Sequence, residues 1–267
     1  MTQTSPRILI VGAGAVGQVY GRHLQRGGAS VTFLVKPHHV SKLQAPLRFY
    51  PLNSYKLTDP PVEFSEYNLV TEPPSASEPG FDQVWLCVSS TALRQPWLKP
   101  LCSAIGDATV VSLLPGIEDR KLLLEYVPEE RLVTGLITII SYPAPLPGEP
   151  EDAKGMAYWF PPLGPTPLSG PPERRDAAVR LLRAGGQPAK THRDVAAISG
   201  FPTAVLMPIL MGLEASNWKF KHLANSEHGP RALNGVREAI AVVSALHGVS
   251  RPWWLPLLTM PTLRALL

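Results

Sequence analysis

Residues 8–24 read ILIVGAGAVGQVYGRHL, and this stretch decides the fold class. An apolar run ends in the spacing GxGxxG, formed by Gly12, Gly14 and Gly17, and a helix-like segment follows. A second apolar run, SVTFLV at residues 30–35, arrives at the distance that a strand, a turn, a helix and another strand require. The sequence therefore predicts a βαβ unit with the glycines between its first strand and its helix.

The glycines of this turn each have a physical reason. Gly12 permits the tight turn, Gly14 lets the backbone approach a pyrophosphate, and Gly17 lets helix and strand pack closely. The N-terminus of the following helix attracts an anion. We therefore predict a dinucleotide site that includes Gly12, Ala13, Gly14, Ala15, Val16 and Gly17.

The end of the second strand indicates which dinucleotide is bound. An Asp or Glu there would accept hydrogen bonds from the ribose 2′-hydroxyl of NAD, but this chain has Lys36, followed by His38 and His39. A cation at this place suits a 2′-phosphate. We therefore expect NADP(H) as cofactor, with His38 or His39 as a helper; the alternative is a pair of solvated loop histidines.

Further short apolar runs continue through the first half, at residues 82–89, 109–116 and 131–140. Their continuous apolar character is typical of a parallel sheet that helices cover on both faces. Many of the 30 prolines then fall in residues 143–172, where we expect irregular chain with at most a short strand at KGMAYWF, residues 154–160. We predict an α/β fold with a Rossmann-type, doubly wound, mostly parallel sheet in residues 1–165.

The remaining sequence has helical patterns. PPERRDAAVRLLRAGG, residues 171–186, has prolines at its start and glycines at its end, as helix termini favour. Two apolar-rich helices are expected after it, at residues 194–220 and 231–249, with a kink or break at Pro208. We predict an all-helical substrate and dimerisation domain in residues 166–267.

Composition restricts the function classes. Hydrophobic residues make up 45% and charged residues 17%, as in soluble globular proteins. The net charge of +4 is scattered, so we expect no nucleic-acid partner. We find no apolar run of the length of a membrane span and no signal peptide, and we expect a cytoplasmic protein. The two cysteines, Cys87 and Cys102, are expected to be buried reduced thiols, and we expect no metal site.

The strand and glycine motif, the cationic end of the second strand, and a helical half with a proline in its first long helix together resemble the ketopantoate reductase family. This family belongs to the wider 6-phosphogluconate dehydrogenase-like group. The resemblance implies NADPH-dependent reduction of a keto group and, by analogy with the fold group, a homodimer. It also extends the expected cofactor site to the residues after two later strands, namely Val88, Ser89, Pro115 and Gly116.

The family's catalytic residues do not carry over. Ser89 stands where the family has a lysine, and Pro115 replaces the asparagine of an Asn-Gly step. The catalytic lysine would fall near Ser199 or Pro202, and no lysine occurs between Lys190 and Lys219. Ala232 stands where the best alignment would put the family's glutamate. Because a cationic acid stabilises the oxygen that gains charge during hydride addition, we expect a substrate other than ketopantoate.

Polar side chains that could replace the family's catalytic residues are most abundant in residues 214–231, EASNWKFKHLANSEHGPR. Lys219 and Lys221 cannot share one helix face, whereas Glu214 and Asn217 could face a cleft together with Lys221. A solvated helix face is the alternative for each of them. The candidate catalytic residues are Ser89, Asn217, Lys221 and His228.

Aromatic residues gather in the second half and suggest a pocket for an apolar or cyclic small molecule, although core packing is the alternative. They are Tyr158, Trp159, Trp218, Phe220, Trp253 and Trp254. A protonated imine would need less from a proton donor than a ketone does. The leading hypothesis is an NADPH-dependent oxidoreductase that reduces a carbonyl or imine compound. A catalytically silent NADP-binding sensor or partner protein, or a protein that uses the site for a nonredox ligand, are the alternatives.

Overall fold

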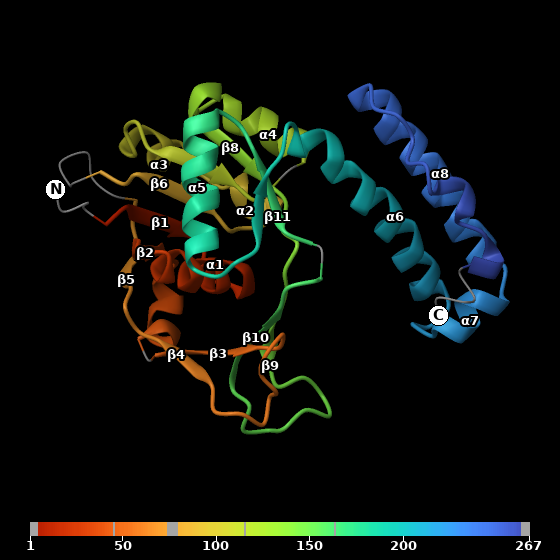
Figure 1. Cartoon of the computed structure of the whole chain (residues 1–267), viewed down its shortest axis with the longest axis horizontal. Helices are drawn as coiled ribbons and strands as arrows, with labels where there is room; N and C mark the ends of the chain where they lie inside the picture. Colours follow the sequence, from red (N-terminus) through yellow and green to blue (C-terminus); the bar gives the residue numbers. More distant parts are fainter. Residues whose placement is uncertain (1–4, 45, 74–79, 115, 163, 263–267) are drawn as a thin grey trace. The chain divides into compact units, whose positions relative to one another are not determined.

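The computed structural model describes residues 5–44, 46–73, 80–114, 116–162 and 164–262. The chain forms two compact units, Met1–Val195 and Ala196–Leu267 (Figure 1). The first unit is built on two sheets, and the second is helical.

Among the described residues, an eight-stranded sheet lies at the centre of the first unit, in the order β12-β11-β8-β7-β6-β1-β2-β5. Its strands are β1 (Arg7–Val11), β2 (Ser30–Leu34), β5 (Asn68–Val70), β6 (Gln83–Leu86), β7 (Thr109–Ser112), β8 (Leu132–Gly135), β11 (Thr166–Ser169) and β12 (Ala189–Thr191). Only β8 and β11 pair antiparallel within this sheet. The predicted mostly parallel, doubly wound sheet is therefore confirmed, and its five predicted strands are β1, β2, β6, β7 and β8.

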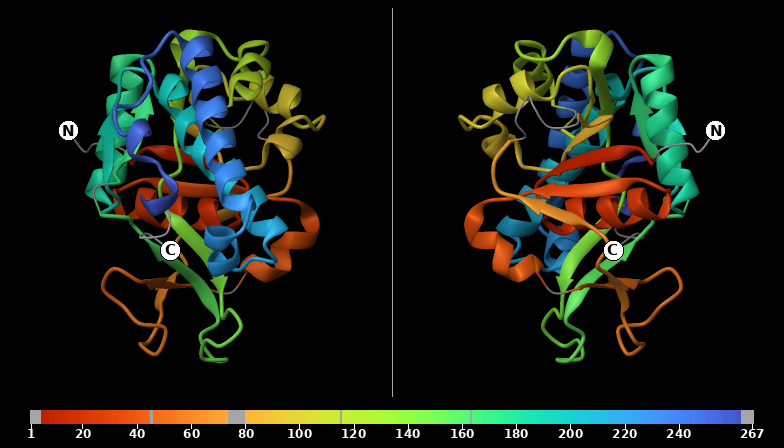
Figure 2. Two further views of the ribbon diagram at one scale, coloured as in Figure 1. Left: turned by 90° about the vertical axis from the view of Figure 1, so that its right-hand side faces the viewer. Right: turned by 90° about the vertical axis from the view of Figure 1, so that its left-hand side faces the viewer.

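Helices lie on both faces of this sheet (Figures 1 and 2). They are α1 (Ala15–Arg26), α2 (Ser90–Leu93), α3 (Leu98–Ala104), α4 (Ile117–Leu124) and α5 (Pro172–Ala184). Alternate residues of β1 belong to different cores: Ile8 and Ile10 pack with residues of α1 and α5, and Leu9 packs with residues of α2, α3 and α4. Burial on both faces explains the continuous apolar runs of the sequence.

A second, four-stranded sheet among the described residues has the order β4-β3-β10-β9 and was not predicted. Its strands are β3 (Leu47–Pro51), β4 (Val62–Phe64), β9 (Ile140–Ala144) and β10 (Gly155–Trp159). The expected short strand at KGMAYWF is β10, but the proline-rich stretch is less irregular than predicted, since β11 and the end of β9 also fall within it. Pro143 lies on β9, an edge strand, where a missing amide donor is tolerated.

The first unit runs to Val195, beyond the predicted boundary between residues 165 and 166. The reason is that β11 pairs with β8, β12 pairs with β11, and α5 packs on the sheet through Val179 and Leu182. The chain after the proline-rich stretch therefore completes the sheet before it turns wholly helical.

The helical unit contains α6 (Val195–Ala215), α7 (Phe220–Asn225) and α8 (His228–His247). Three short 3-10 helices also occur in the described chain: η1 (Pro37–Leu43) and η2 (Glu129–Arg131) in the first unit, and η3 (Leu255–Leu257) in this one. The predicted break at Pro208 does not occur, because α6 continues through it. Pro208 lies against α8 at Gly235, where a Cβ would come within 3.1 Å of the proline ring.

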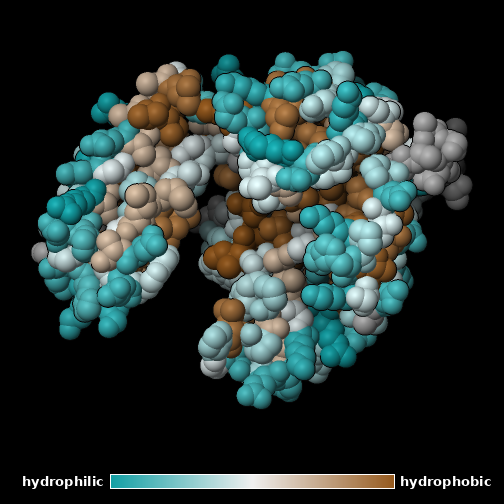
Figure 3. All heavy atoms as spheres, turned by 180° about the vertical axis from the view of Figure 1, so that it is seen from behind, coloured by the Kyte–Doolittle hydropathy of each residue, from teal (hydrophilic) through white to brown (hydrophobic). Residues whose placement is uncertain are grey.

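By length and composition α6 is apolar enough to cross a membrane, contrary to the expectation that no such run occurs. One such helix is weak evidence of a membrane span, since core helices of soluble proteins have the same length and composition. Several of its apolar side chains are exposed, among them Leu206, Met207 and Met211. Figure 3 shows hydrophobic patches between hydrophilic residues on this unit.

Candidate functional site

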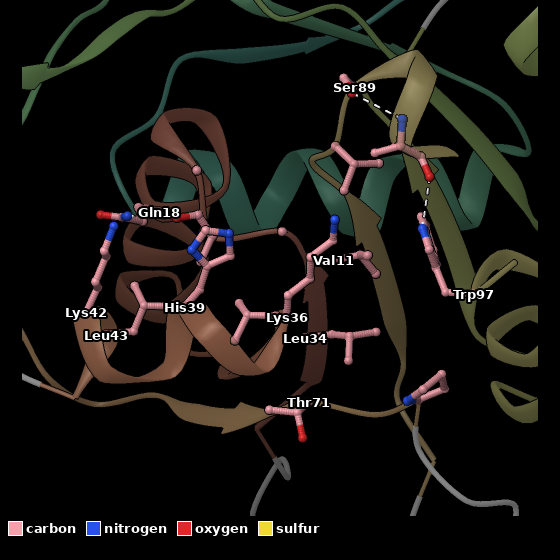
Figure 4. Close-up of a pocket in the computed structure, with 17 residues that line it drawn as sticks. Val11, Gln18, Leu34, Lys36, His39, Lys42, Leu43, Thr71, Ser89 and Trp97 are labelled. Atoms are coloured by element: carbon pink, nitrogen blue, oxygen red, sulfur yellow. Dashed lines mark hydrogen bonds between the residues drawn. The ribbon is translucent and has the colours of Figure 1, made fainter. Parts of the chain in front are cut away.

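A cavity of about 600 Å³ lies at the carboxyl ends of β1, β2 and β6, beside the glycine turn (Figure 4). We call it the glycine-turn cavity, and it is lined by Val11, Gly12, Ala13, Gly14, Gln18, Leu34, Val35, Lys36, His39, Lys42, Leu43, Thr71, Pro73, Val88, Ser89, Ala92 and Trp97. All of these residues belong to the first unit. The carboxyl edge of a doubly wound sheet is the place where such folds bind ligands.

The geometry of the turn agrees with the reasons given for its glycines. Gly12 has φ +95°, and a Cβ there would lie 2.8 Å from the carbonyl oxygen of Cys87. A Cβ on Gly17 would overlap the carbonyl oxygen of Gly12, so α1 can approach the turn only because this residue has no side chain. Gly14, by contrast, has no atom within 4 Å of where its Cβ would be and borders the cavity. The backbone is therefore open to a ligand at Gly14.

Most residues predicted for the cofactor site lie at this cavity. Its lining includes Gly12, Ala13, Gly14, Lys36, Val88 and Ser89. The lining does not include Ala15, Val16 or Gly17, which begin α1, or Gly116, which is the N-cap of α4. Pro115 is outside the described residues.

Positive side chains gather where β2 ends. Lys36 follows that strand, and His39 and Lys42 are brought to the same cavity by η1 (Figure 4). Desolvation lowers the pKa of His39, and the positive charges of His38, Lys42 and Lys36 lower it further. Of the two histidines considered from the sequence, His39 lines the cavity and His38 does not. The sequence-based prediction of the cofactor site did not include Lys42, although its spacing of one helical turn from His39 could have indicated it.

Ser89 stands at the β6 side of the cavity and is the N-cap of α2. Its Oγ accepts a hydrogen bond from the backbone N–H of Ala92 at 3.2 Å, and Trp97 Nε1 donates to the carbonyl oxygen of Ala92 at 2.9 Å (Figure 4). A serine hydroxyl that accepts one bond still carries a proton to donate. Ser89 therefore has a structural role that leaves its donor available.

An ion pair connects the segments that follow β6 and β7. Arg94 Nη1 in the C-cap of α2 lies 2.6 Å from Asp119 Oδ1 in α4, and Ser90 Oγ donates to the same carboxylate oxygen at 2.6 Å. The Asp119 side chain is 10% exposed, so this contact is largely shielded from water. It holds α2, and with it Ser89, in place beside the cavity.

The family model described as "Ketopantoate reductase PanE/ApbA" matches residues 8–149, more than half of the chain. The chain belongs to the ketopantoate reductase PanE/ApbA family. A comparison with curated proteins found no match.

Solved structures of similar fold agree with membership of this family. The 2-dehydropantoate 2-reductase from Geobacter metallireducens GS-15 is 18% identical with a TM-score of 0.73, over 97% of this chain and 83% of that one. The PanE/ApbA family ketopantoate reductase from Ralstonia eutropha JMP134 is 22% identical with a TM-score of 0.72, over 97% and 80% of the two chains. D-mandelate dehydrogenase, solved with NADH, is 18% identical with a TM-score of 0.63, over 97% and 77%. The first two carry the family's name, and the third shows that a protein of this fold binds a nicotinamide cofactor.

In this ketopantoate reductase family member, the other candidate catalytic residues lie together in the helical unit. They line a pocket of about 480 Å³ where α6, α7 and α8 meet, which we call the junction pocket. Its lining residues are Ala215, Ser216, Asn217, Lys221, His222, Asn225, Ser226 and His228. Three of the four predicted residues, Asn217, Lys221 and His228, are thus brought together, while Ser89 lies in the first unit.

The predicted helix face shared by Glu214, Asn217 and Lys221 does not exist. The helix α6 ends at Ala215, and Asn217 and Trp218 have left-handed φ angles of 52° and 58°. Glu214 is therefore not part of the junction pocket lining, and Lys219, the N-cap of α7, also lies outside it. The turn at Asn217 and Trp218 is not helical, so helical periodicity could not predict which side chains line the junction pocket.

The aromatic residues of the second half are divided between the two units of this family member. Tyr158 is buried in the core of the first unit, Trp254 packs in the core of the helical unit, and Trp253 is exposed. None of the six lines either of the two cavities in the part of the chain that the structure describes. Within the same residues, no group of three or more His, Cys, Asp or Glu could hold a metal ion.

Proposed function

We propose that this chain binds NADP(H) in the glycine-turn cavity and reduces a small carbonyl or imine compound other than ketopantoate. The observation that carries the proposal is the pairing of an open backbone at Gly14 with the cations Lys36 and Lys42 in one cavity. Membership of the ketopantoate reductase family supports the reaction class. We further propose a cytoplasmic homodimer, on the analogy of the fold group.

The charges of the cavity support the phosphorylated cofactor. Lys36, His39 and Lys42 line it, and none of the described lining residues is an Asp or Glu that would accept hydrogen bonds from a free 2′-hydroxyl. A 2′-phosphate would instead receive charge-assisted hydrogen bonds from these side chains. D-mandelate dehydrogenase, which has the same fold, was solved with NADH. A comparison of NADPH with NADH is therefore the sharpest test of this proposal.

The candidate catalytic groups divide into two sets. Bound NADPH supplies a hydride to the substrate carbon. We propose that Ser89, through its free donor, and Asn217, Lys221 and His228 bind the substrate or deliver the proton that the reduced oxygen or nitrogen needs. An iminium substrate already carries this proton, which suits the proposal that Ser89 stands in place of the family's lysine.

The binding part of the proposal is tested by fluorescence titration with NADPH and NADH. We expect NADPH to bind about tenfold more tightly or better, which corresponds to about 1.4 kcal/mol. Equal affinities would contradict the preference for the phosphorylated form. If neither dinucleotide binds, the proposal as a whole is wrong.

The catalytic part is tested by following NADPH consumption with ketones, aldehydes and cyclic imines. Turnover that falls about 100-fold in Lys221→Gln, with NADPH affinity retained, would support the role of Lys221. The control is Lys219→Gln, because Lys219 is outside the junction pocket.

One observation favours a catalytically silent NADP-binding protein as the second candidate. Ser89 Oγ accepts the hydrogen bond that caps α2, and the resemblance to the family implies a lysine at this position. In this case NADPH would bind without turnover of any compound in the screen. Robust consumption of NADPH with one substrate would exclude this candidate.

A further inference from the structure

We infer that Gln18 is a positioning residue of the glycine turn. It fixes the two peptide groups that flank Gly14, so that their N–H groups point to where the phosphates of a nucleotide bind. The inference rests on the proposed function, because it takes a dinucleotide as the ligand of the glycine-turn cavity. Gln18 belongs to α1 and lines this cavity (Figure 4). The GxGxxG spacing does not include it, since it follows the last glycine of the motif.

Gln18 holds the carbonyl group on each side of Gly14. Its side-chain Nε2 donates to the carbonyl oxygen of Ala13 at 2.7 Å, and its backbone N–H donates to the carbonyl oxygen of Gly14 at 3.0 Å. The side-chain bond needs a donor such as an amide NH₂, because a carbonyl oxygen only accepts. The side chain reaches back to Ala13 because the side chains of a helix lean towards its N-terminus.

These two bonds also fix the directions of two donors. A peptide group is planar and trans, so its N–H points opposite to its C=O. Since the C=O of Ala13 points to the Gln18 amide, the N–H of Gly14 points away from that amide. Since the C=O of Gly14 is bonded along α1, the N–H of Ala15 points out of the helix end. Neither N–H donates to any residue that the structure describes, so both are available to a ligand.

Gly14 needs this restraint more than the other glycines of the turn. A glycine has no Cβ to restrict φ and ψ, and no atom lies within 4 Å of where a Cβ on Gly14 would be. Gly12 and Gly17, in contrast, are packed against Cys87 and against each other. Donors that are already fixed before a ligand arrives lose less entropy when it binds. The hydrogen bonds of Gln18 therefore supply the order that packing does not give to Gly14.

The test compares the parent with Gln18→Met and Gln18→Glu, which keep the length of the side chain but remove the amide donor. We expect Gln18→Met to weaken NADPH binding about tenfold in a fluorescence titration. Gln18→Glu should weaken it further, because its negative charge repels the phosphates. The matched control is Gln25→Met on the same helix. Gln25 donates to Glu66 outside the cavity, so its loss should leave NADPH affinity unchanged.

A smaller ligand separates positioning from a general loss of structure. Adenosine 2′-monophosphate has the base, the ribose and the 2′-phosphate of NADPH, but it lacks the phosphates on the 5′ side that the N–H groups of Gly14 and Ala15 would bind. Its affinity should stay within about twofold of the parent in Gln18→Met, which corresponds to a small part of the loss for NADPH. The same variant should melt within a few degrees of the parent.

The positioning is also measured without any ligand, by nitrogen-15 relaxation of the backbone amides of Gly14 and Ala15. We expect order parameters of about 0.85 in the parent, as in rigid backbone, and lower values in Gln18→Met. Gln25→Met should leave both values as they are in the parent.

Three results would overturn the inference while the proposed function stands: equal NADPH affinity in the parent and Gln18→Met, an equal loss of affinity for adenosine 2′-monophosphate and NADPH, or unchanged order parameters in Gln18→Met. A parent that binds neither NADPH nor NADH contradicts the proposed function and this inference together. The titration of the parent therefore distinguishes the two failures.

Discussion

Gly17 lies so close to Gly12 that a Cβ on Gly17 would overlap the carbonyl oxygen of Gly12. The overlapped atom is backbone, so relief requires α1 to move away from the turn. We expect Gly17→Ala to lower the free energy of unfolding by about 2 kcal/mol or more and to weaken NADPH binding with it. Urea denaturation and NADPH titration of the same preparation measure both effects.

Gly14→Ala is the matched control, because a Cβ at Gly14 would meet no atom within 4 Å. We expect its stability to stay within about 1 kcal/mol of the parent. Its NADPH affinity should nevertheless fall about tenfold if the cofactor backbone approaches this residue. Unchanged affinity in Gly14→Ala would place the pyrophosphate elsewhere.

Lys36 and Lys42 are expected to discriminate between the two dinucleotides. Each positive side chain lines the cavity beside His39. Lys36→Gln and Lys42→Gln should each weaken NADPH binding by about tenfold and leave NADH affinity nearly unchanged, since only NADPH carries the extra phosphate. Lys56→Gln, outside the cavity, serves as the control. Parallel losses for NADH and NADPH would argue against a 2′-phosphate contact.

Asp119 is expected to stabilise the first unit through Arg94 and Ser90. Its carboxylate is largely buried and receives hydrogen bonds from both. Asp119→Asn should cost about 1–2 kcal/mol, less than a fully buried pair would, because the Arg94 side chain is 44% exposed.

Glu118→Gln removes a neighbouring carboxylate whose ion pair with Lys121 is exposed, and should change stability by less than about 0.5 kcal/mol. The comparison is made by urea denaturation. Equal effects of the two substitutions would show that the Arg94 contact contributes nothing beyond surface charge.

His23 is expected to make stability depend on pH. The ring accepts from the Tyr158 hydroxyl at Nε2 (3.2 Å), and Nδ1–H donates to the carbonyl oxygen of Gly185 (2.8 Å), while Arg22 donates to the same hydroxyl. This chain of hydrogen bonds needs neutral His23. The pKa of His23 is lowered from 6.5 to about 4: burial is the main cause, the hydrogen bond to Gly185 opposes it, and the positive charges of Arg22 and Arg26 contribute to the lowering.

Between these two pKa values the unfolded chain binds the proton and the folded chain does not, so stability is lost as the pH falls from about 6.5 to about 4. The total loss is on the order of 3 kcal/mol, at 1.36 kcal/mol per pKa unit. Denaturation curves recorded across this range measure it. His23→Gln should flatten the dependence, whereas a substitution of the exposed His38 to Gln should leave it; a flat profile in the parent would contradict the assignment.

Local sequence patterns were sufficient to predict much of the fold of the first unit. The continuous apolar runs of β1, β2, β6, β7 and β8 were sufficient to predict a parallel sheet, because burial on both faces leaves that signature in each strand by itself. GxGxxG could be interpreted one glycine at a time, because the φ of Gly12 is a property of one residue and Gly17 meets the turn within the motif itself. Lys36 could be placed at the end of β2 for the same reason.

Long-range contacts were not predictable in this way. Pairing of β3 with β10 joins residues about a hundred positions apart, and the prolines around β10 gave no sign of it. The boundary at Val195, rather than after residue 165, followed from β11 and β12 joining the main sheet. Strand order depends on which edges meet in space, and no periodicity within one strand records that.

The sequence by itself determined the βαβ unit, the glycine turn and the cation at the end of β2, since each depends on a few neighbouring residues. Only the tertiary structure decided that Lys42 and Trp97 join the glycine-turn cavity, that Arg94 and Asp119 connect α2 to α4, and that Ser216 is buried beside Lys221. The physical reason is that cavities and buried partners are made by side chains from separate elements, and their meeting depends on packing that local sequence does not encode.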